Sequence, residues 1–158
     1  MSDQGATTKK ADWARFAKSG TTLVSEIMTE NPISAEPTTT VREVMGVMYS
    51  DDIRHLPVID AGQLIGIISD RDLRSFSEPD ALSTLDKLGE IGARLEDPIS
   101  SIMRGDVVYI EADSTIDSLI DLMLETKIGA IPVVEPGTET LVGIVSYIDI
   151  LETARGEL

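Results

Sequence analysis

The pattern Gly-hydrophobic-x-Ser-x-x-Asp occurs twice in the chain, and it pairs Ser69 with Asp72 and Ser146 with Asp149. Each pair follows an apolar run rich in Val and Ile, where a strand is expected to pass into a helix. At such a junction the two side chains can cap the first turn of the helix. The helix start also presents free backbone N–H groups and the positive end of its dipole, which favour an anion such as phosphate. Capping and ligand binding are both open, and one residue pair can serve both.

The residue types that catalysis needs are missing from the chain or are wrongly spaced. There is no cysteine, so thiolate metal sites and cysteine nucleophiles are excluded, and the only histidine is His55. No Ser-His-Asp arrangement, Walker-type phosphate loop or His-rich metal spacing occurs. Adjacent carboxylates such as Asp51 and Asp52 would diverge on a helix or turn. We therefore expect no enzyme activity, no required cofactor and no metal site.

The chain is strongly acidic. Its 158 residues include 28 acidic and 13 basic side chains, which gives a formal net charge of −15. A field of this sign repels the nucleic-acid backbone, so nucleic-acid binding is not expected, although a cleft that concentrates the few cations can still bind a small anion. The longest apolar runs, such as 64–68, are too short to cross a membrane, and no signal-peptide pattern opens the chain. We expect a cytoplasmic protein without a membrane partner.

An internal repeat determines the expected architecture. Residues 24–60 align with 99–135 at an offset of 75, and residues 64–73 align with 141–150 at an offset of 77. Fourteen of these 47 aligned positions are identical, among them both Ser-x-x-Asp pairs. The chain is therefore expected to contain two copies of one unit of about 50 residues.

Each repeat is predicted to fold in the order β-α-β-β-α. A short extended segment comes first, over 33–35 or 107–110. Next is a helix, which in the first repeat begins with a capping box of Thr40 and Glu43. The apolar residues of the two helices recur at i, i+3, i+4 and i+7, and they are Val41, Val44, Met45 and Met48, and Ile116, Leu119, Ile120 and Met123. Two buried strands follow, over 56–59 and 64–68 or 131–134 and 141–145, and a final helix begins near Asp70 or Tyr147.

The repeat also sets the expected domain boundaries. Residues 1–21 form either a loose tail or a short helix that docks Trp13 and Phe16, and residues 22–77 form the first repeat. A partly helical linker spans 78–97, and the second repeat spans 98–155. One repeat has too little core to be stable alone. We expect two units, packed sheet to sheet.

The repeats resemble a known family. The segments IRHLPVIDAGQLIGIISDRDLR and IGAIPVVEPGTETLVGIVSYIDIL look like the second half of the CBS domain, named after cystathionine beta-synthase. The upstream segments VSEIMTENPISAEPTTTVREVMGVM and ISSIMRGDVVYIEADSTIDSLIDLM look like its first half. The resemblance covers about residues 22–153. It implies an α+β fold, with two β-α-β-β-α units packed as a Bateman-type module that has two clefts.

The resemblance also implies which residues bind a ligand. The closing aspartates, Asp72 and Asp149, are expected to hold ribose hydroxyls, since a carboxylate accepts strong hydrogen bonds from a diol. The residues expected near phosphate are Ser69, Arg71, Ser146 and Ile148. The residues expected to line the clefts before the Leu-Pro or Ile-Pro step are Arg54, His55, Gly129 and Ala130, and those expected to frame the base are Thr29, Asn31, Ile33, Asp106 and Val108. For His55 a purely structural role is the alternative.

The two clefts are expected to differ. Arg71 can donate hydrogen bonds and carries charge, whereas its counterpart Ile148 can do neither. The first cleft is therefore predicted to be the better phosphate site, and the side to which Arg54 and His55 belong is left open. Arg71 pairing with Asp70 or another nearby acid on the surface is the alternative to a phosphate role.

Members of the resembled family commonly bind AMP, ADP, ATP, S-adenosylmethionine or NAD and regulate another protein. The resemblance thus implies an adenosine-type ligand and an unidentified protein partner. It also implies a homodimer, because the exposed helices carry more apolar residues than one buried stripe needs, for example Val47, Leu122 and Leu124. A structural dimerisation module that binds no small molecule is the alternative function.

Overall fold

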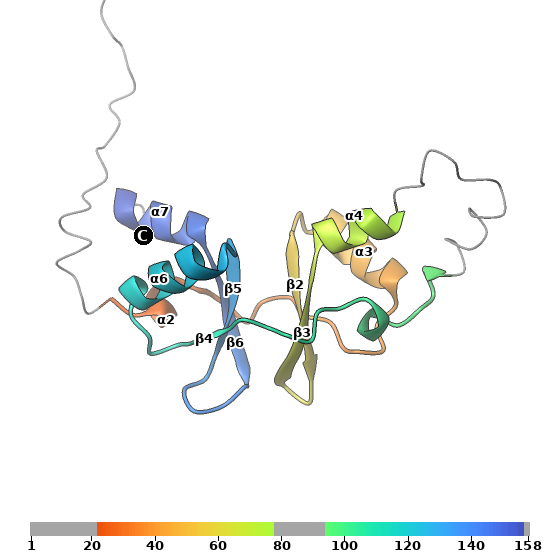
Figure 1. The fold of residues 1–158 in the computed structure, drawn as a ribbon, viewed down its shortest axis with the longest axis horizontal. Helices are drawn as coiled ribbons and strands as arrows, with labels where there is room; N and C mark the ends of the chain where they lie inside the picture. The colour runs from red at the N-terminus through yellow and green to blue at the C-terminus, as the bar shows by residue number, and fades with distance from the viewer. Residues whose placement is uncertain (1–21, 78–93, 157–158) are drawn as a thin grey trace, which may run out of the picture. The chain divides into compact units, whose positions relative to one another are not determined.

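The computed structural model of the chain describes residues 22–77 and 94–156 (Figure 1). The predicted N-terminal tail and most of the predicted linker lie outside the described residues. The elements are, in chain order, α2 (Val24–Ile27), β1 (Thr29–Glu30), α3 (Val41–Ser50), β2 (His55–Asp60), β3 (Gln63–Ser69), α4 (Asp70–Ser77), η1 (Ile99–Ser101), β4 (Ile110–Glu111), α6 (Ile116–Thr126), β5 (Ala130–Val134), β6 (Leu141–Ser146) and α7 (Tyr147–Arg155).

The helices and strands predicted for the body of each repeat are confirmed. Helix α3 begins after Thr40, whose backbone N–H donates to the Glu43 carboxylate at 2.9 Å while its hydroxyl accepts from the Glu43 N–H at 3.2 Å. The predicted capping box is therefore present. Val41, Val44 and Met48 are buried on one side of this helix, as their spacing predicts.

The described residues form two compact units, which we name after the aspartate that each contains. The Asp149 unit comprises residues 22–31, 109–138 and 142–156. The Asp72 unit comprises residues 32–77, 94–108 and 139–141. Neither unit coincides with one sequence repeat.

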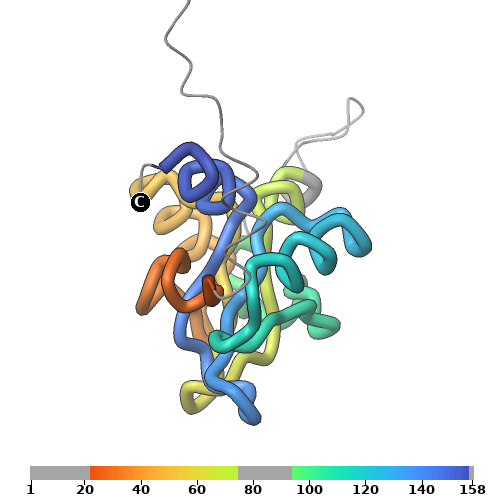
Figure 2. Tube along the Cα trace, turned by 90° about the vertical axis from the view of Figure 1, so that its left-hand side faces the viewer, coloured from red at the N-terminus to blue at the C-terminus, as the bar shows by residue number. Residues whose placement is uncertain are grey.

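The Asp149 unit is built on a sheet with strand order β1-β6-β5-β4. Strand β1 is antiparallel to β6, and β4 is parallel to β5. Helices α6 and α7 lie on the same face of this sheet (Figures 1 and 2). Fully buried side chains such as Leu119, Val133 and Val145 form its core.

The Asp72 unit is built on an antiparallel hairpin of β2 and β3, in which His55 lies opposite Ser69. The turn at Ala61 and Gly62 has positive φ at both residues, 51° and 81°, which suits the right-handed twist of a hairpin. Helices α3 and α4 lie on one face of the hairpin (Figure 1). The core of this unit includes Leu56 and Ile68.

The extended segment predicted over 33–35 forms less strand than expected. Only Ala35 pairs, in a parallel bridge with Val58, and the equivalent pairing of Ile110 with Val133 begins β4. The chain turns directly after Ala35, because the Glu36 N–H donates to the Thr39 hydroxyl at 3.1 Å. This turn ends the extended segment and leads into α3.

The repeats exchange their opening segments. Thr29 of the first repeat pairs with Ile144 of the second, and Arg104 of the second repeat pairs with Ile67 of the first. The same exchange is seen one turn earlier, where the Val24 N–H donates to the Ser114 carbonyl at 2.8 Å. Each unit is therefore assembled from both repeats, which the repeat alignment did not predict.

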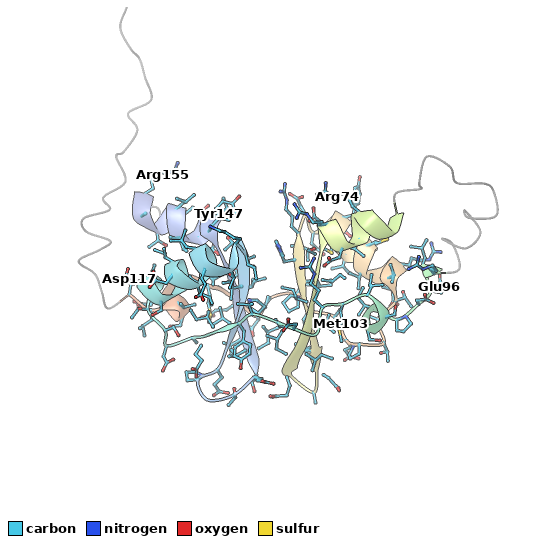
Figure 3. The ribbon with its side chains drawn as sticks, in the orientation of Figure 1. Arg74, Glu96, Met103, Asp117, Tyr147 and Arg155 are labelled. Atoms are coloured by element: carbon cyan, nitrogen blue, oxygen red, sulfur yellow. The ribbon has the colours of Figure 1, made fainter. Side chains whose placement is uncertain are left out.

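Two glycines permit this exchange. A Cβ atom on Gly66 would lie 2.5 Å from the sulfur of Met103 and 3.2 Å from the Arg104 carbonyl oxygen. A Cβ atom on Gly143 would meet the sulfur of Met28 in the same way. Figure 3 labels Met103 in the segment that runs beside β3. The glycine of each repeat therefore makes room for the methionine of the other repeat.

Within the described ranges, no helix has the length and apolar character needed to span a bilayer.

Candidate functional site

The junction of β3 and α4 brings Ser69 and Asp72 together. The Ser69 N–H donates to Asp72 Oδ2 at 3.0 Å, and the Asp72 N–H donates to the Ser69 hydroxyl at 3.2 Å. These reciprocal bonds satisfy two backbone donors of the first helical turn. The capping role considered for this pair is therefore real, and it holds the carboxylate at the helix start.

The junction of β6 and α7 has the same arrangement. The Ser146 N–H donates to Asp149 Oδ2 at 2.8 Å, and the Asp149 N–H donates to the Ser146 hydroxyl at 3.4 Å. In both units the described hydrogen bonds from the serine reach Oδ2 of the aspartate. The second carboxylate oxygen, Oδ1, is therefore the atom with which the two junctions can differ.

They do differ at this atom. Arg104 donates from Nη2 to Asp72 Oδ1 at 3.0 Å, in an ion pair whose side chains are 65% and 16% exposed. The Arg104 backbone is fixed by two hydrogen bonds of 3.1 Å with Ile67, one in each direction. In the Asp149 unit the equivalent residue is Thr29, opposite Ile144. The segment 104–108 was expected to frame a base, but a contact of Arg104 with Asp72 was not predicted. The only sequence signal for it was an arginine aligned with a threonine.

The surroundings of Asp72 lower the pKa of its carboxyl. Partial burial raises this pKa, but the hydrogen bonds from Ser69 and the guanidinium of Arg104 outweigh burial, so the pKa lies below its ordinary value. The carboxylate is thus held in its charged form, the form that accepts hydrogen bonds.

Arg54 and His55 belong to the Asp72 unit. The Asp70 N–H donates to the Arg54 carbonyl at 2.9 Å, so the residue before β2 meets the start of α4. Burial lowers the pKa of His55 and outweighs the opposing charges of Asp70 and Asp72. His55 is therefore mainly neutral at pH 7 and contributes polarity rather than charge.

Two arginines, Arg71 and Arg74, lie in helix α4, whose first turn contains Asp70 and Asp72. Arg71 is exposed in the first turn of α4. The carboxylate of Asp70, considered as a partner for Arg71, accepts from Arg74 at 3.0 Å, and the surface pairing of Arg71 stays a prediction. Both carboxylates at this helix start thus pair with an arginine, Asp70 with Arg74 and Asp72 with Arg104.

The second unit lacks cations at the equivalent positions. Gly129 takes the place of Arg54, and its carbonyl accepts from the Tyr147 N–H at 3.0 Å. Ile148 takes the place of Arg71 and is 45% exposed. Ala130, the counterpart of His55, is only 6% exposed and contributes to the core.

The residues predicted to frame a base divide between the units. Thr29 and Asn31 are exposed in the Asp149 unit, and Asn31 has φ +48°, a left-handed conformation that asparagine tolerates. Ile33, Asp106 and Val108 belong to the Asp72 unit, where Val108 is half-buried and the other two are exposed.

A surface pocket of about 500 Å³ opens between α3 and α4 of the Asp72 unit, with Tyr49, Arg54 and Asp70 in its lining.

No group of three or more His, Cys, Asp or Glu side chains that could hold a metal ion occurs in the described part of the chain.

Comparison with known proteins identifies the family. The CBS domain family model matches residues 24–78 and 99–156, which is most of the chain. A CBS domain-containing protein of Dictyostelium discoideum is 33% identical over 133 residues, which are 82% of this chain and 89% of the relative. The chain belongs to the CBS domain family, as a tandem pair with an α+β fold.

Solved structures agree with this assignment. The protein AcuB from Vibrio cholerae has a TM-score of 0.68 and 30% identity, over 85% of this chain and 91% of that one. The CBS domain pair of protein MJ0100, solved in complex with 5-methylthioadenosine and S-adenosyl-L-methionine, has a TM-score of 0.66 and 28% identity, over 87% of this chain and 98% of that one.

Other relatives are longer than this chain. The chain spans 46% of the Methanocaldococcus jannaschii protein MJ1225, to which it is 25% identical over 82% of its own length. It spans 25% of the L-aspartate semialdehyde sulfurtransferase of the same organism, at 31% identity over 89% of this chain. CBS domain pairs are generally regulatory, and enzyme names among the relatives belong to proteins of which this chain matches only a part.

Proposed function

We propose that the chain is a regulatory module that binds an adenosine-type ligand at its Ser-x-x-Asp junctions and modulates a partner protein. The observation that carries this proposal is the pair of junctions, each with a carboxylate whose Oδ2 is fixed by capping. The complex of the MJ0100 domain pair with two adenosine compounds supports the same ligand class.

The proposed chemistry uses the carboxylate for the ribose. An ionised carboxylate accepts up to about four hydrogen bonds, so capping leaves acceptor sites for a ribose diol. The helix start supplies N–H groups and a positive dipole for phosphate. Arg54 and Arg71 add charge in the Asp72 unit, whereas Gly129 and Ile148 add none in the other. The Asp72 unit is therefore the proposed site for a phosphorylated ligand.

A thermal-shift panel tests the proposal. AMP, ADP, ATP, S-adenosylmethionine and NAD are each added at millimolar concentration. A ligand at 100 times its Kd stabilises the folded state by about 2.7 kcal/mol, which corresponds to a rise in Tm of several degrees. We expect at least one compound to give this rise. A Tm that none of the five compounds changes would favour the alternative, a structural module without a small-molecule ligand.

We also propose that the chain forms a homodimer through its helices. Tyr49 on α3 is 92% exposed, and Leu124, its counterpart on α6, is 63% exposed. Tyr147, Ile148 and Leu151 add exposed apolar surface on α7. Large apolar side chains exposed on several helices favour association, and a closed two-fold pair is the commonest form.

A further inference from the structure

The ion pair between Arg104 and Asp72 is a further difference between the two candidate sites. Thr29 and Arg104 occupy the same place in their units, since each lies opposite the strand residue that follows the motif glycine, Ile144 or Ile67. From this place the Arg104 side chain reaches the capped Asp72, and Thr29 holds the equivalent place in the unit that contains Asp149. Only Arg104 brings a positive charge to this place.

Arg104 is held in position by its backbone. Two hydrogen bonds join it to Ile67, and the side chain of the preceding residue, Met103, lies against Gly66. The guanidinium thus reaches Asp72 Oδ1 from a fixed start. The Asp72 end of the ion pair is mostly buried, whereas the Arg104 end is largely exposed. A ligand that reaches the carboxylate therefore also meets the guanidinium.

The charge of the pair decides which ligand the site accepts. A phosphate near an uncompensated, partly buried carboxylate is repelled, because Coulomb interactions are stronger there than in bulk water. Arg104 cancels that repulsion at Asp72. A guanidinium has five N–H donors, so one Nη2 bond to Asp72 leaves others that can meet a phosphate oxygen.

In the Asp149 unit, the described residues at the places of Arg54, Arg71 and Arg104 are all neutral. They are Gly129, Ile148 and Thr29. The carboxylate of Asp149 accepts hydrogen bonds from Ser146, and no described cation makes an ion pair with it. A phosphorylated compound gains no such compensation at this carboxylate.

We infer that Arg104 is the specificity-determining residue for ligand charge in the Asp72 unit, where its ion pair with Asp72 makes the site prefer phosphorylated adenosine compounds over uncharged ones. This inference rests on the proposed adenosine-binding function. It assigns the preference to a residue from the second repeat that acts on a motif of the first.

The test compares AMP with adenosine by calorimetry on the full chain at one ionic strength. The proteins are the wild type, Arg104→Thr, which copies the other unit, and Arg104→Lys, which keeps the charge. In Arg104→Thr we expect the ratio of AMP affinity to adenosine affinity to fall about tenfold at the tighter site, equivalent to about 1.4 kcal/mol. Arg104→Lys should keep most of the ratio. The reciprocal change, Thr29→Arg, should raise the same ratio at the weaker site.

The outcomes separate the two claims. If the wild type binds AMP but Arg104→Thr keeps the wild-type ratio, Arg104 does not set the charge preference, while the proposed function stands. A rise in affinity for both compounds in Arg104→Thr, at an unchanged ratio, would mean that the ion pair merely competes with the ligand, and it also overturns the inference. If neither AMP nor adenosine binds the wild type, while its Tm shows a folded protein, the inference is wrong, and the panel of five adenosine compounds decides the proposed function.

Discussion

Arg104 and Asp72 form an ion pair of 3.0 Å although they belong to different sequence repeats. The pair exists because the opening segment of the second repeat lies along β3 of the first, where Arg104 is paired with Ile67. A change in that opening segment therefore alters the charge at the Ser-x-x-Asp motif of the other repeat. Each candidate site therefore lies in a unit that contains residues from both sequence repeats.

The lowered pKa of Asp72 predicts a pH-dependent contribution to stability. Because the pKa is lower in the folded than in the unfolded chain, the charged carboxylate stabilises the fold above about pH 4–5, and the contribution is lost as the pH falls through the folded-state pKa. Urea unfolding should show that Asp72→Asn costs about 1.5 kcal/mol at pH 7 and progressively less towards pH 3. In Arg104→Thr this pH dependence should be smaller. A cost of Asp72→Asn that stays constant from pH 7 to pH 3 would contradict the assignment.

Capping and ligand binding can be separated with matched serine and threonine variants. Ser69→Ala and Thr40→Ala each remove a hydroxyl that caps a helix in the Asp72 unit. Both should lower the free energy of unfolding by about 1 kcal/mol. Only Ser69→Ala should also weaken AMP binding, measured by calorimetry at a temperature where both variants are folded. Equal AMP affinities in the two variants would leave Ser69 with a structural role alone.

The close approach of Gly66 to the exchanged segment predicts a coupled effect on stability. Gly66→Ala places a Cβ atom 2.5 Å from the Met103 sulfur, so we expect a cost of about 1–3 kcal/mol. Gly46→Ala, in α3 with open space around it, should instead stabilise by roughly 0.5–1 kcal/mol. The double variant Gly66→Ala/Met103→Ala should lose less stability than the sum of the losses of the two single variants, because the clash between the new Cβ atom and the Met103 sulfur is absent. Strictly additive costs in thermal unfolding would show that the two residues do not meet.

The exposed helix residues predict the oligomeric state. Light scattering at micromolar concentration should give twice the chain mass of 17.1 kDa. Tyr49→Glu and Leu124→Glu each place a charge among exposed apolar side chains and should shift the population towards the monomer. Glu135→Ala, after β5, is the control and should leave the mass unchanged. A wild-type mass of a single chain would refute the dimer.

Sequence reasoning found the elements whose signals are local. The period of Val41, Val44 and Met48 predicted α3, and the apolar runs predicted β2 and β3, because burial on one side imposes a regular spacing. The Ser-x-x-Asp junctions were also located correctly, since capping is a local property.

What sequence reasoning missed depends on contacts between distant segments. The short strand β1 has two residues and no apolar alternation, and it exists only through its pairing with β6. The ion pair of Arg104 with Asp72 joins residues 32 positions apart, and it depends on the pairing of Arg104 with Ile67 of β3. The repeat alignment placed Arg104 over Thr29 but could not show which aspartate either residue would face.

The most direct test of the account is calorimetry of AMP binding to the wild type, Asp72→Asn and Asp149→Asn. Asparagine keeps the shape of the cap but removes the charge that would hold the ribose. Losing hydrogen bonds to a charged group costs roughly 1.5–3 kcal/mol, so Asp72→Asn should weaken the tighter event about ten- to a hundredfold. Asp149→Asn should leave that event nearly unchanged. A tight event that survives Asp72→Asn and disappears in Asp149→Asn would contradict the assignment of the sites, and a wild type that binds neither AMP nor any other adenosine compound would contradict the account as a whole.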